Sequence, residues 1–284
     1  MRSLSPRLQT LLARLPKVRW PAVSPRWRPV LLVLLGLVTG WLLTVTTQAF
    51  QSPPLVLGQD AVTLKASLAA RVTLQKDGGH FINIQPANGE AHTLLVFYPG
   101  GKVRPQAYEW LGRALAEDGV QTIIPVFPLD LAVLGVNRAD HLIDRYGKRK
   151  RIFVGGHSLG GAMAAQYASR KAVRVDGLLL AAAYPARNTS LRRTSLKVLS
   201  LLAEKDGVAP PADVRDGLNR LPPGTKLVVV PGAVHSFFGR YGPQRGDGLP
   251  RVSRAEAEAV ILQSVRAFLK EAPVKEPAAE QRKP

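Results

Sequence analysis

One short stretch, residues 151–168, constrains the fold of this chain more than any other. The apolar run Ile152-Phe153-Val154 leads into Gly156-His157-Ser158-Leu159-Gly160, and a run of small residues follows. The pattern Gly-x-Ser-x-Gly between a strand and a helix predicts a sharp turn, a nucleophile elbow, whose serine is held in a strained backbone conformation. Ser158 is therefore predicted to expose its hydroxyl at a sheet edge, with the Leu159 N–H directed at a developing oxyanion. The alternative is a glycine turn that only joins a strand to a helix.

Composition restricts the other chemistries that are open to the chain. Its 284 residues suffice for one α/β domain with appendages. There is no cysteine, which excludes disulfides, thiolate catalysis and cysteine-based zinc sites. The five histidines, at positions 80, 92, 141, 157 and 235, lack the spacing of metal ligands. We therefore expect neither a metal site nor a cofactor.

The formal charge of +19 first suggests a nucleic-acid partner. Many of the basic residues, however, lie in the N-terminal segment, and no acidic residue precedes Asp60. They lie beside a long apolar stretch, which indicates a membrane instead, so no nucleic-acid partner is predicted. A second basic cluster, residues 145–151, is predicted to be a solvated loop, with contact to anionic lipid or another polyanion as the alternative.

The first fifty residues indicate attachment to a membrane. Residues 1–29 are predicted to form a basic cytoplasmic tail, and residues 30–50 a transmembrane anchor, because about 20 apolar residues cross a bilayer as a helix. The positive-inside rule then places the N-terminus in the cytoplasm and the rest of the chain outside it, as a single-pass protein of the cell membrane. The alternative is a signal peptide cleaved near Thr47-Gln48-Ala49, which would leave a secreted protein.

The remaining residues are predicted to form one domain between two tails. We expect a linker at 51–60, a catalytic domain at 61–272 and a disordered tail at 273–284. Strand signals at 62–65 and a hairpin at 71–84 are followed by apolar strands that alternate with helices, among them an amphipathic helix at 106–118 and a helix at 212–221. A closing amphipathic helix is expected at 254–270. This order predicts an α/β fold: a mostly parallel, doubly wound sheet with helices on both faces.

A serine hydroxyl needs a base, and the base needs a carboxylate that orients it. In this topology both follow the serine, acid first and histidine second, on loops after later strands. Asp206 ends a predicted strand at 197–202, with Glu204 as the alternative acid, and His235 follows a strand at 226–230. The sequence therefore predicts a catalytic triad of Ser158, Asp206 and His235.

The rest of the site is predicted from two further segments. The turn Tyr98-Pro99-Gly100-Gly101-Lys102 follows the first long parallel strand and should supply a second oxyanion donor, Gly101 or alternatively Lys102. His157 is interpreted as structural. The aromatic side chains after the histidine are candidates for the wall of an acyl pocket: Phe237, Phe238 and Tyr241.

These motifs together resemble those of serine α/β-hydrolases, and within them a branch with a Tyr-Pro-Gly-Gly turn that is distantly similar to dienelactone hydrolases. The resemblance covers about residues 90–270 and rests on segments 97–103, 155–164, 204–208 and 235–244. It implies Ser158 as nucleophile, Asp206 as acid and His235 as base. Two departures stand out: Tyr-Pro-Gly-Gly replaces the His-Gly of many members, and the short segment between Ala183 and Lys197 leaves no room for a large helical lid.

We therefore expect a membrane-tethered serine hydrolase that cleaves an ester-like bond, a carboxylic ester or related acyl group, through an acyl-enzyme. Its partners would be a small-molecule or lipid-like acyl substrate and, through residues 30–50, a membrane. The alternatives are an acyltransferase that uses the same triad and a non-catalytic membrane-tethered protein of this fold.

Overall fold

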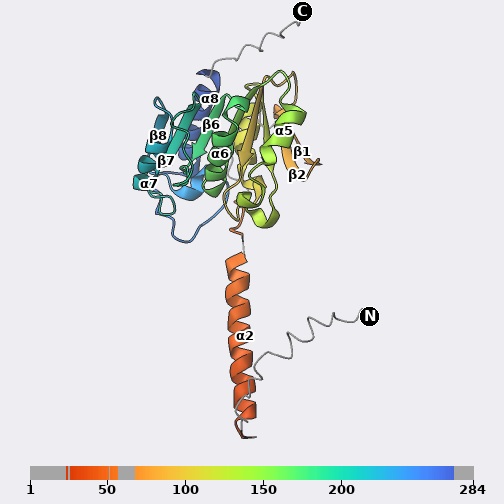
Figure 1. Ribbon diagram of the computed structural model, residues 1–284, viewed down its shortest axis with the longest axis vertical. Helices are drawn as coiled ribbons and strands as arrows, with labels where there is room; N and C mark the ends of the chain where they lie inside the picture. Colours follow the sequence, from red (N-terminus) through yellow and green to blue (C-terminus); the bar gives the residue numbers. More distant parts are fainter. Residues whose placement is uncertain (1–23, 25, 51, 57–67, 272–284) are drawn as a thin grey trace, which may run out of the picture. The chain divides into compact units, whose positions relative to one another are not determined.

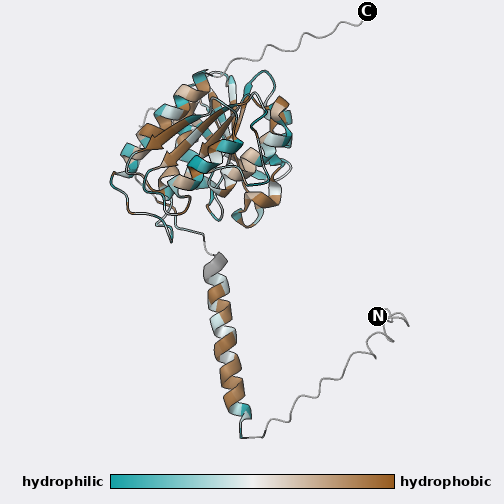
Figure 2. Ribbon diagram, turned by 60° about the vertical axis from the view of Figure 1, so that its left-hand side comes forward, coloured by the Kyte–Doolittle hydropathy of each residue, from teal (hydrophilic) through white to brown (hydrophobic). Residues whose placement is uncertain are grey.

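The computed structural model describes residues 24, 26–50, 52–56 and 68–271, and the chain divides after Gln51 into two units. Helix α2 (Arg28–Phe50) belongs to the first unit and includes residues 30–50, the segment for which an anchor is predicted. Its residues Arg28–Thr47 are long and apolar enough to cross a membrane, by length and composition, and none of its most apolar window is buried. In Figure 2 much of the α2 ribbon is brown, the colour of hydrophobic residues. A signal sequence would pass the same test.

The second unit contains an eight-stranded sheet with the order β1-β2-β4-β3-β5-β6-β7-β8 (Figure 1). Strands β1 and β2 form an antiparallel hairpin, β2 also pairs antiparallel with β4, and every other neighbouring pair is parallel. The predicted doubly wound, mostly parallel fold is thus confirmed. The strand bounds are Ala70–Lys76, His80–Pro86, Thr93–Tyr98, Val120–Pro125, Arg151–His157, Gly177–Ala181, Lys197–Ala203 and Lys226–Val230, for β1 to β8.

Helices cover both faces of the sheet because its central strands are apolar on both sides. All six residues of β3 are buried; Leu95 and Phe97 lie on the face of α4 (Glu109–Ala116) and α8 (Arg254–Glu271). Leu94 and Val96 lie on the opposite face, with α5 (Arg138–Tyr146) and α6 (Leu159–Arg170). Figure 1 shows α5, α6 and α7 (Pro211–Gly217) in front of the sheet and α8 behind it.

Several boundaries differ from the sequence prediction. The helix expected from Gln106 begins instead as the 3-10 helix η1 (Pro105–Tyr108), which α4 continues, and the helix expected at 212–221 is α7 followed by the 3-10 helix η5 (Leu218–Arg220). Part of the expected linker, residues 52–56, lies against the domain, where Leu55 forms an isolated bridge with Tyr241. The predicted strand at 62–65 and the tails at 1–23 and 273–284 lie outside the described residues.

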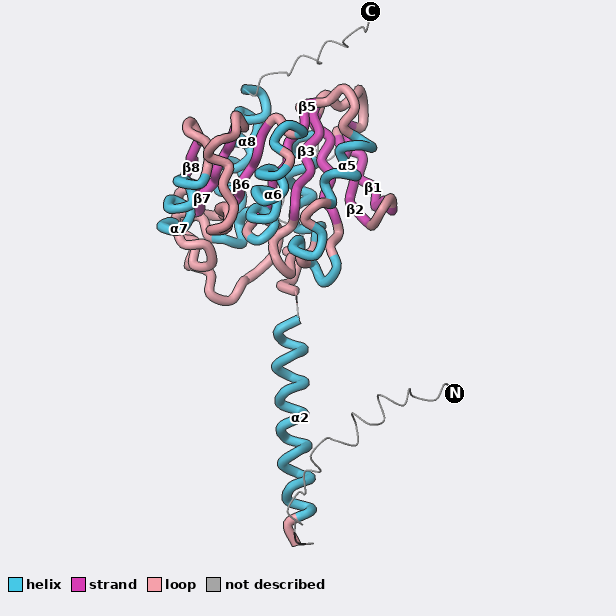
Figure 3. The backbone as a smooth tube through the Cα atoms, viewed as in Figure 1, coloured by secondary structure: helices cyan, strands magenta, loops and turns pink. Residues whose placement is uncertain are grey.

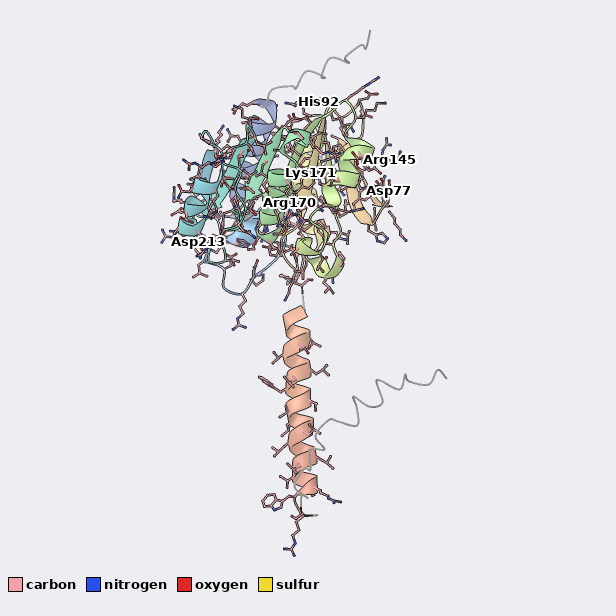
Figure 4. The ribbon with its side chains drawn as sticks, viewed as in Figure 1. Asp77, His92, Arg145, Arg170, Lys171 and Asp213 are labelled. Carbon is pink, nitrogen blue, oxygen red and sulfur yellow. The ribbon has the colours of Figure 1, made fainter. Side chains whose placement is uncertain are left out.

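The basic cluster at 145–151 is held partly by contacts to the sheet. Arg145 lies beside the turn of the β1–β2 hairpin, its Nε 3.6 Å from an oxygen of Asp77 (Figure 4). Arg151 donates to the Thr93 hydroxyl at 2.9 Å and to the Leu269 carbonyl at 2.6 Å. These side chains therefore have structural partners within the domain.

The order of the strands brings the segments of the predicted site to one edge of the sheet. Tyr98, the last residue of β3, is paired with Gly156 of β5, and Ala203, the last residue of β7, is paired with Val230 of β8. Since these strands are parallel, the loops after them share the carboxyl-end edge; the loops at the strand ends are drawn in pink in Figure 3. Figure 4 labels a residue near each end of the strands. His92 precedes β3, and Asp213 follows the loop that contains Asp206; the two lie toward opposite ends of the sheet.

Candidate active site

The elbow forms where β5 ends and α6 begins. Ser158 has φ 52° and ψ −125°, a conformation that non-glycine residues rarely adopt. A Cβ atom on Gly156 would lie 2.6 Å from the Tyr98 carbonyl oxygen, and one on Gly160 would overlap the carbonyl oxygens of Tyr98 and Pro99. Both glycines are therefore required for the end of β3 to approach the elbow, and the strained turn leaves Ser158 partly exposed.

The predicted acid and base meet on neighbouring loops. His235 Nδ1 lies 2.8 Å from Asp206 Oδ2, and the two side chains are 1% and 0% exposed. The other oxygen of Asp206 accepts the backbone N–H groups of Val208 and Ala209, at 2.9 and 2.7 Å. Because the carboxylate is fixed by its own loop, it holds the imidazole with Nδ1–H toward Asp206, which leaves Nε2 as the proton acceptor.

Among the described residues, no hydrogen bond joins Ser158 to His235. In the described part of the chain the Ser158 hydroxyl has no hydrogen-bond partner. The ring of His157, the residue before it, lies with its centroid 4.4 Å from that of His235. Catalytic hydrogen bonds are often long in free enzymes and shorten when substrate binds. The structure therefore brings the elbow and the acid–base pair to one place, with the Ser158–His235 contact left open.

Glu204, the alternative acid, is directed elsewhere. Its Oε2 accepts the Gly232 N–H at 2.8 Å, and its Oε1 lies 3.0 Å from Lys205 Nζ. The Gly232 hydrogen bond, followed by Lys205, lowers the pKa of the Glu204 carboxyl below its ordinary value. Of the two candidates, only Asp206 contacts the histidine.

Gly101 and Leu159, the first two residues predicted as oxyanion donors, lie close together. A Cβ atom on Gly101 would be 3.1 Å from Leu159 Cδ2. Among the described residues, neither the Gly101 N–H nor the Leu159 N–H is donated to another group. The alternative donor differs, because the Lys102 N–H already donates to the Asp130 carbonyl at 2.8 Å. The geometry therefore favours Gly101 and disfavours Lys102.

A buried tyrosine, which the sequence analysis did not identify, ties the oxyanion turn to the elbow. Tyr108 OH accepts the Gly100 N–H at 3.0 Å and lies 2.9 Å from His157 Nδ1. Because this hydroxyl accepts the hydrogen bond from Gly100, its own proton is free to be donated to His157 Nδ1. Nδ1 is then an acceptor, so the proton of the neutral His157 ring is on Nε2. Burial raises the pKa of Tyr108 well above its ordinary value, so the hydroxyl keeps its proton.

His157 itself is neutral. Its complete burial, with a smaller contribution from the imidazole of His235, holds its pKa well below the ordinary value, against an opposing contact with the His235 backbone. Its Nε2 is a buried atom without a hydrogen-bond partner in the described structure. His157 thus links the Tyr108 hydroxyl to His235 by packing, in accordance with its interpretation as structural.

Asp247 is a second residue that the sequence analysis missed. Its carboxylate accepts the backbone N–H groups of His235 at 2.9 Å, Ser236 at 2.9 Å and Gly248 at 2.8 Å, and the Gly207 N–H lies 3.5 Å away. It therefore joins the loop of the base to the loop of the acid. The available signal was the flexible sequence Gly246-Asp247-Gly248, which by itself indicates only a turn.

The aromatic residues after His235 do not line an open pocket as a group. Phe238 and Tyr241 are 2% and 0% exposed and pack against His157, with ring centroids 5.7 and 6.0 Å away. Phe237 is partly buried beneath Arg254, whose guanidinium carbon is 4.6 Å from the ring centroid. These side chains support the histidine loop, so the expected acyl-pocket wall is corrected for Phe238 and Tyr241.

The described residues contain no group of three or more His, Asp or Glu side chains that could hold a metal ion. Among the described residues, the site holds a strained serine, a buried imidazole–carboxylate pair and two N–H groups, of Gly101 and Leu159, without an acceptor. This arrangement suits nucleophilic attack on a carbonyl and stabilisation of the resulting oxyanion.

Comparisons with known proteins place the chain in a class. A model of the alpha/beta hydrolase family matches residues 94–259, more than half of the chain, and the chain belongs to that family. No curated protein sequence matches it.

Two solved structures share the fold. One is a predicted CIB-like hydrolase from Thermoplasma acidophilum, with a TM-score of 0.52 at 16% identity, covering 70% of this chain and 98% of the other. The second is an alpha-beta serine hydrolase homologue from Coxiella burnetii, with a TM-score of 0.51 at 18% identity, covering 69% and 96%. At these identities the likeness concerns the fold alone, and family and fold together support a hydrolase.

Proposed function

We propose that the protein is a membrane-tethered serine hydrolase that cleaves a carboxylic ester or a related acyl bond. The observation that carries the proposal is the buried His235–Asp206 pair, 2.8 Å apart, next to an elbow whose serine has φ 52°. Strain of this kind is retained where the surrounding structure imposes it, and it is concentrated at functional sites.

In the proposed reaction, Ser158 Oγ bonds to the carbonyl carbon while its proton passes to His235 Nε2. Asp206 stabilises the resulting imidazolium, and the N–H groups of Gly101 and Leu159 stabilise the oxyanion. When the tetrahedral intermediate collapses, the C–O bond to the leaving alcohol breaks and the alcohol takes the proton from His235. Water, deprotonated by His235, then attacks the acyl-enzyme and releases the acid and Ser158.

We further propose that α2 anchors the protein, with the N-terminus in the cytoplasm and the hydrolase domain on the other side of the membrane. The length of the apolar segment and the basic residues before it support this orientation. The competing outcome is cleavage of the segment as a signal peptide, which would release the domain.

One experiment tests both parts: labelling of the full chain in cells with a fluorophosphonate probe, followed by fractionation and an alkaline wash of the membranes. The label is expected on the native chain in the washed membranes and absent from Ser158→Ala. The matched control is Ser169→Ala, on the same helix, where the hydroxyl bonds only to the Gln166 carbonyl at 2.8 Å. Labelling that persists in Ser158→Ala would refute the nucleophile, and labelled protein in the soluble fraction would refute the anchor.

A further inference from the structure

A short apolar segment projects from the edge of the sheet that holds the candidate site. It follows β4 and contains the 3-10 helices η2 (Pro128–Asp130) and η3 (Ala132–Gly135). Its side chains Leu129, Val133 and Leu134 are 66%, 51% and 54% exposed. A group of exposed apolar side chains on one short segment indicates a binding surface more often than an isolated exposed leucine does. We call these three residues the apolar rim.

The segment that carries the rim contacts the oxyanion turn through Asp130 and Leu131, outside the rim residues themselves. Asp130, next to Leu129, accepts the Lys102 N–H of the oxyanion turn at 2.8 Å, and Leu131 Cδ2 would lie 3.8 Å from a Cβ on Gly101. Leu129 and Asp130 have φ angles of 55° and 52°, a left-handed pair that side-chain-bearing residues rarely adopt. The position of the rim is thus fixed by the same turn that supplies an oxyanion donor.

The chain enters the domain along the same edge. Ser52 donates a hydrogen bond to Asp130 Oδ2 at 3.3 Å, which places the start of the domain beside the rim. From there the chain runs to the loop after His235: Gly242 donates to the Pro54 carbonyl, and Val56 donates to the Arg240 carbonyl, both at 3.0 Å. These contacts attach residues 52–56 to both sides of the site.

The segment that is long and apolar enough to cross a membrane ends at Thr47, five residues before Ser52. Five residues of chain span at most about 18 Å. If the helix crosses a membrane, Ser52 therefore stays close to the membrane surface, and so does the edge of the domain to which Ser52 is bonded. An apolar surface held at that level would lose its contact with water by entering the lipid headgroup region.

We propose that the apolar rim docks on the lipid bilayer and presents the site to ester substrates dissolved in it. This inference rests on the proposed function for both the anchor and the hydrolysis. It narrows the substrate class to amphiphilic esters that reach Ser158 from the membrane surface. A rim fixed to the oxyanion turn would serve such substrates without a large lid, for which the segment between β6 and β7 has no room.

The docking can be measured without catalysis, because the native chain contains no cysteine. Leu134→Cys in the full chain is labelled with an environment-sensitive nitrobenzoxadiazole dye and reconstituted in phosphatidylcholine vesicles with or without brominated acyl chains. The matched control is Leu74→Cys, on edge strand β1, where the leucine is 68% exposed. We expect blue-shifted emission and quenching by bromine at 134 only. Equal emission and quenching at both positions would overturn the proposal. A blue shift at 134 without quenching by bromine would also overturn it, because it would indicate that a protein, such as a second copy, covers the rim.

A second measurement tests the effect on catalysis. In the double variant Val133→Ser/Leu134→Ser, hydrolysis of an ester dissolved in the vesicles should fall about tenfold, because two apolar side chains no longer favour the bilayer. Hydrolysis of water-soluble p-nitrophenyl acetate should stay unchanged, as should both activities in Leu74→Ser. An equal loss for both substrates would mean a distorted site and would refute docking. Native protein that hydrolyses neither ester would refute the proposed function instead, and the dye measurement would still decide whether the rim enters the bilayer.

Discussion

The substitution Asp247→Asn tests whether the base is positioned from outside the triad. Asp247 accepts three backbone N–H groups within 2.9 Å, among them that of His235, and none of its contacts reaches the imidazole of His235. Asparagine has the same shape but carries no charge, and one of its oxygens is replaced by an NH₂ group. In either orientation, that NH₂ faces at least one backbone N–H group, so at least one hydrogen bond is lost and the rest are weakened.

The size of the effect follows from these contacts. A hydrogen bond to a charged group contributes about 1.5–3 kcal/mol, whereas one to a neutral group contributes about 1 kcal/mol. Loss of one bond and weakening of the others therefore costs about 2–4 kcal/mol of folding free energy. Because the His235 loop is released on one side, kcat/KM should also fall, by about 10- to 100-fold, since displacement of a catalytic group by about 1 Å is enough for that loss.

The assay is hydrolysis of a water-soluble ester by the full chain, together with urea unfolding, so that kcat/KM is expressed per folded molecule. The matched control is Asp216→Asn, whose exposed carboxylate pairs with Arg220 at 3.1 Å and should change stability by less than about 0.5 kcal/mol. The decrease should lie in kcat rather than KM, and the pH at which activity is half-maximal should stay the same. Unchanged kcat in a destabilised Asp247→Asn would refute the positioning role and leave only a structural one.

Two further predictions concern the buried pair behind the elbow. Tyr108→Phe removes the hydroxyl that joins Gly100 to His157, at 3.0 and 2.9 Å. The substitution should cost about 1–3 kcal/mol of folding stability and lower kcat/KM for a soluble ester. The control Tyr184→Phe, at a half-exposed site, should change neither quantity. Acid should destabilise the fold through His157: burial holds its folded-state pKa well below that of the unfolded chain, so between the two values the unfolded chain binds the extra proton. Stability is then complete above about pH 6.5 and falls by about 1.4 kcal/mol per pH unit below it, a slope that urea unfolding should find reduced in His157→Gln; an equal slope in the variant would refute this assignment.

The fold and the positions of Asp206 and His235 on neighbouring loops were predictable because each depends on a local pattern. Strand β5, the elbow and α6 are contiguous, and Asp206 and His235 each follow a strand that is recognisable as a short apolar run. The family match confirms the fold class. The hydrogen bond between Asp206 and His235 then follows from topology. Strands β7 and β8 are parallel neighbours, so the loops that follow them lie at the same edge of the sheet.

The residues that support the triad were not predictable from local patterns. Tyr108 lies 49 positions before His157, on a segment expected to be an ordinary amphipathic helix, where a buried tyrosine indicates only core. Asp247 follows His235 by 12 positions in a turn, and any turn aspartate has the same sequence signature. In both cases the partner is a backbone N–H group or a ring nitrogen, and such a group leaves no trace in the pattern of residue types.

The choice between Gly101 and Lys102 shows where this limit lies. The two residues are adjacent in a turn, and the sequence offers no reason why one N–H rather than the other should be available. The decision comes from Asp130, after β4, whose carbonyl takes the Lys102 N–H. The same left-handed residue accepts the hydroxyl of Ser52. One turn after β4 therefore engages the Lys102 N–H, holds the start of the domain and carries the apolar rim. If the proposed oxyanion site and docking are right, a change at Asp130 that displaces this turn should alter catalysis and membrane docking together.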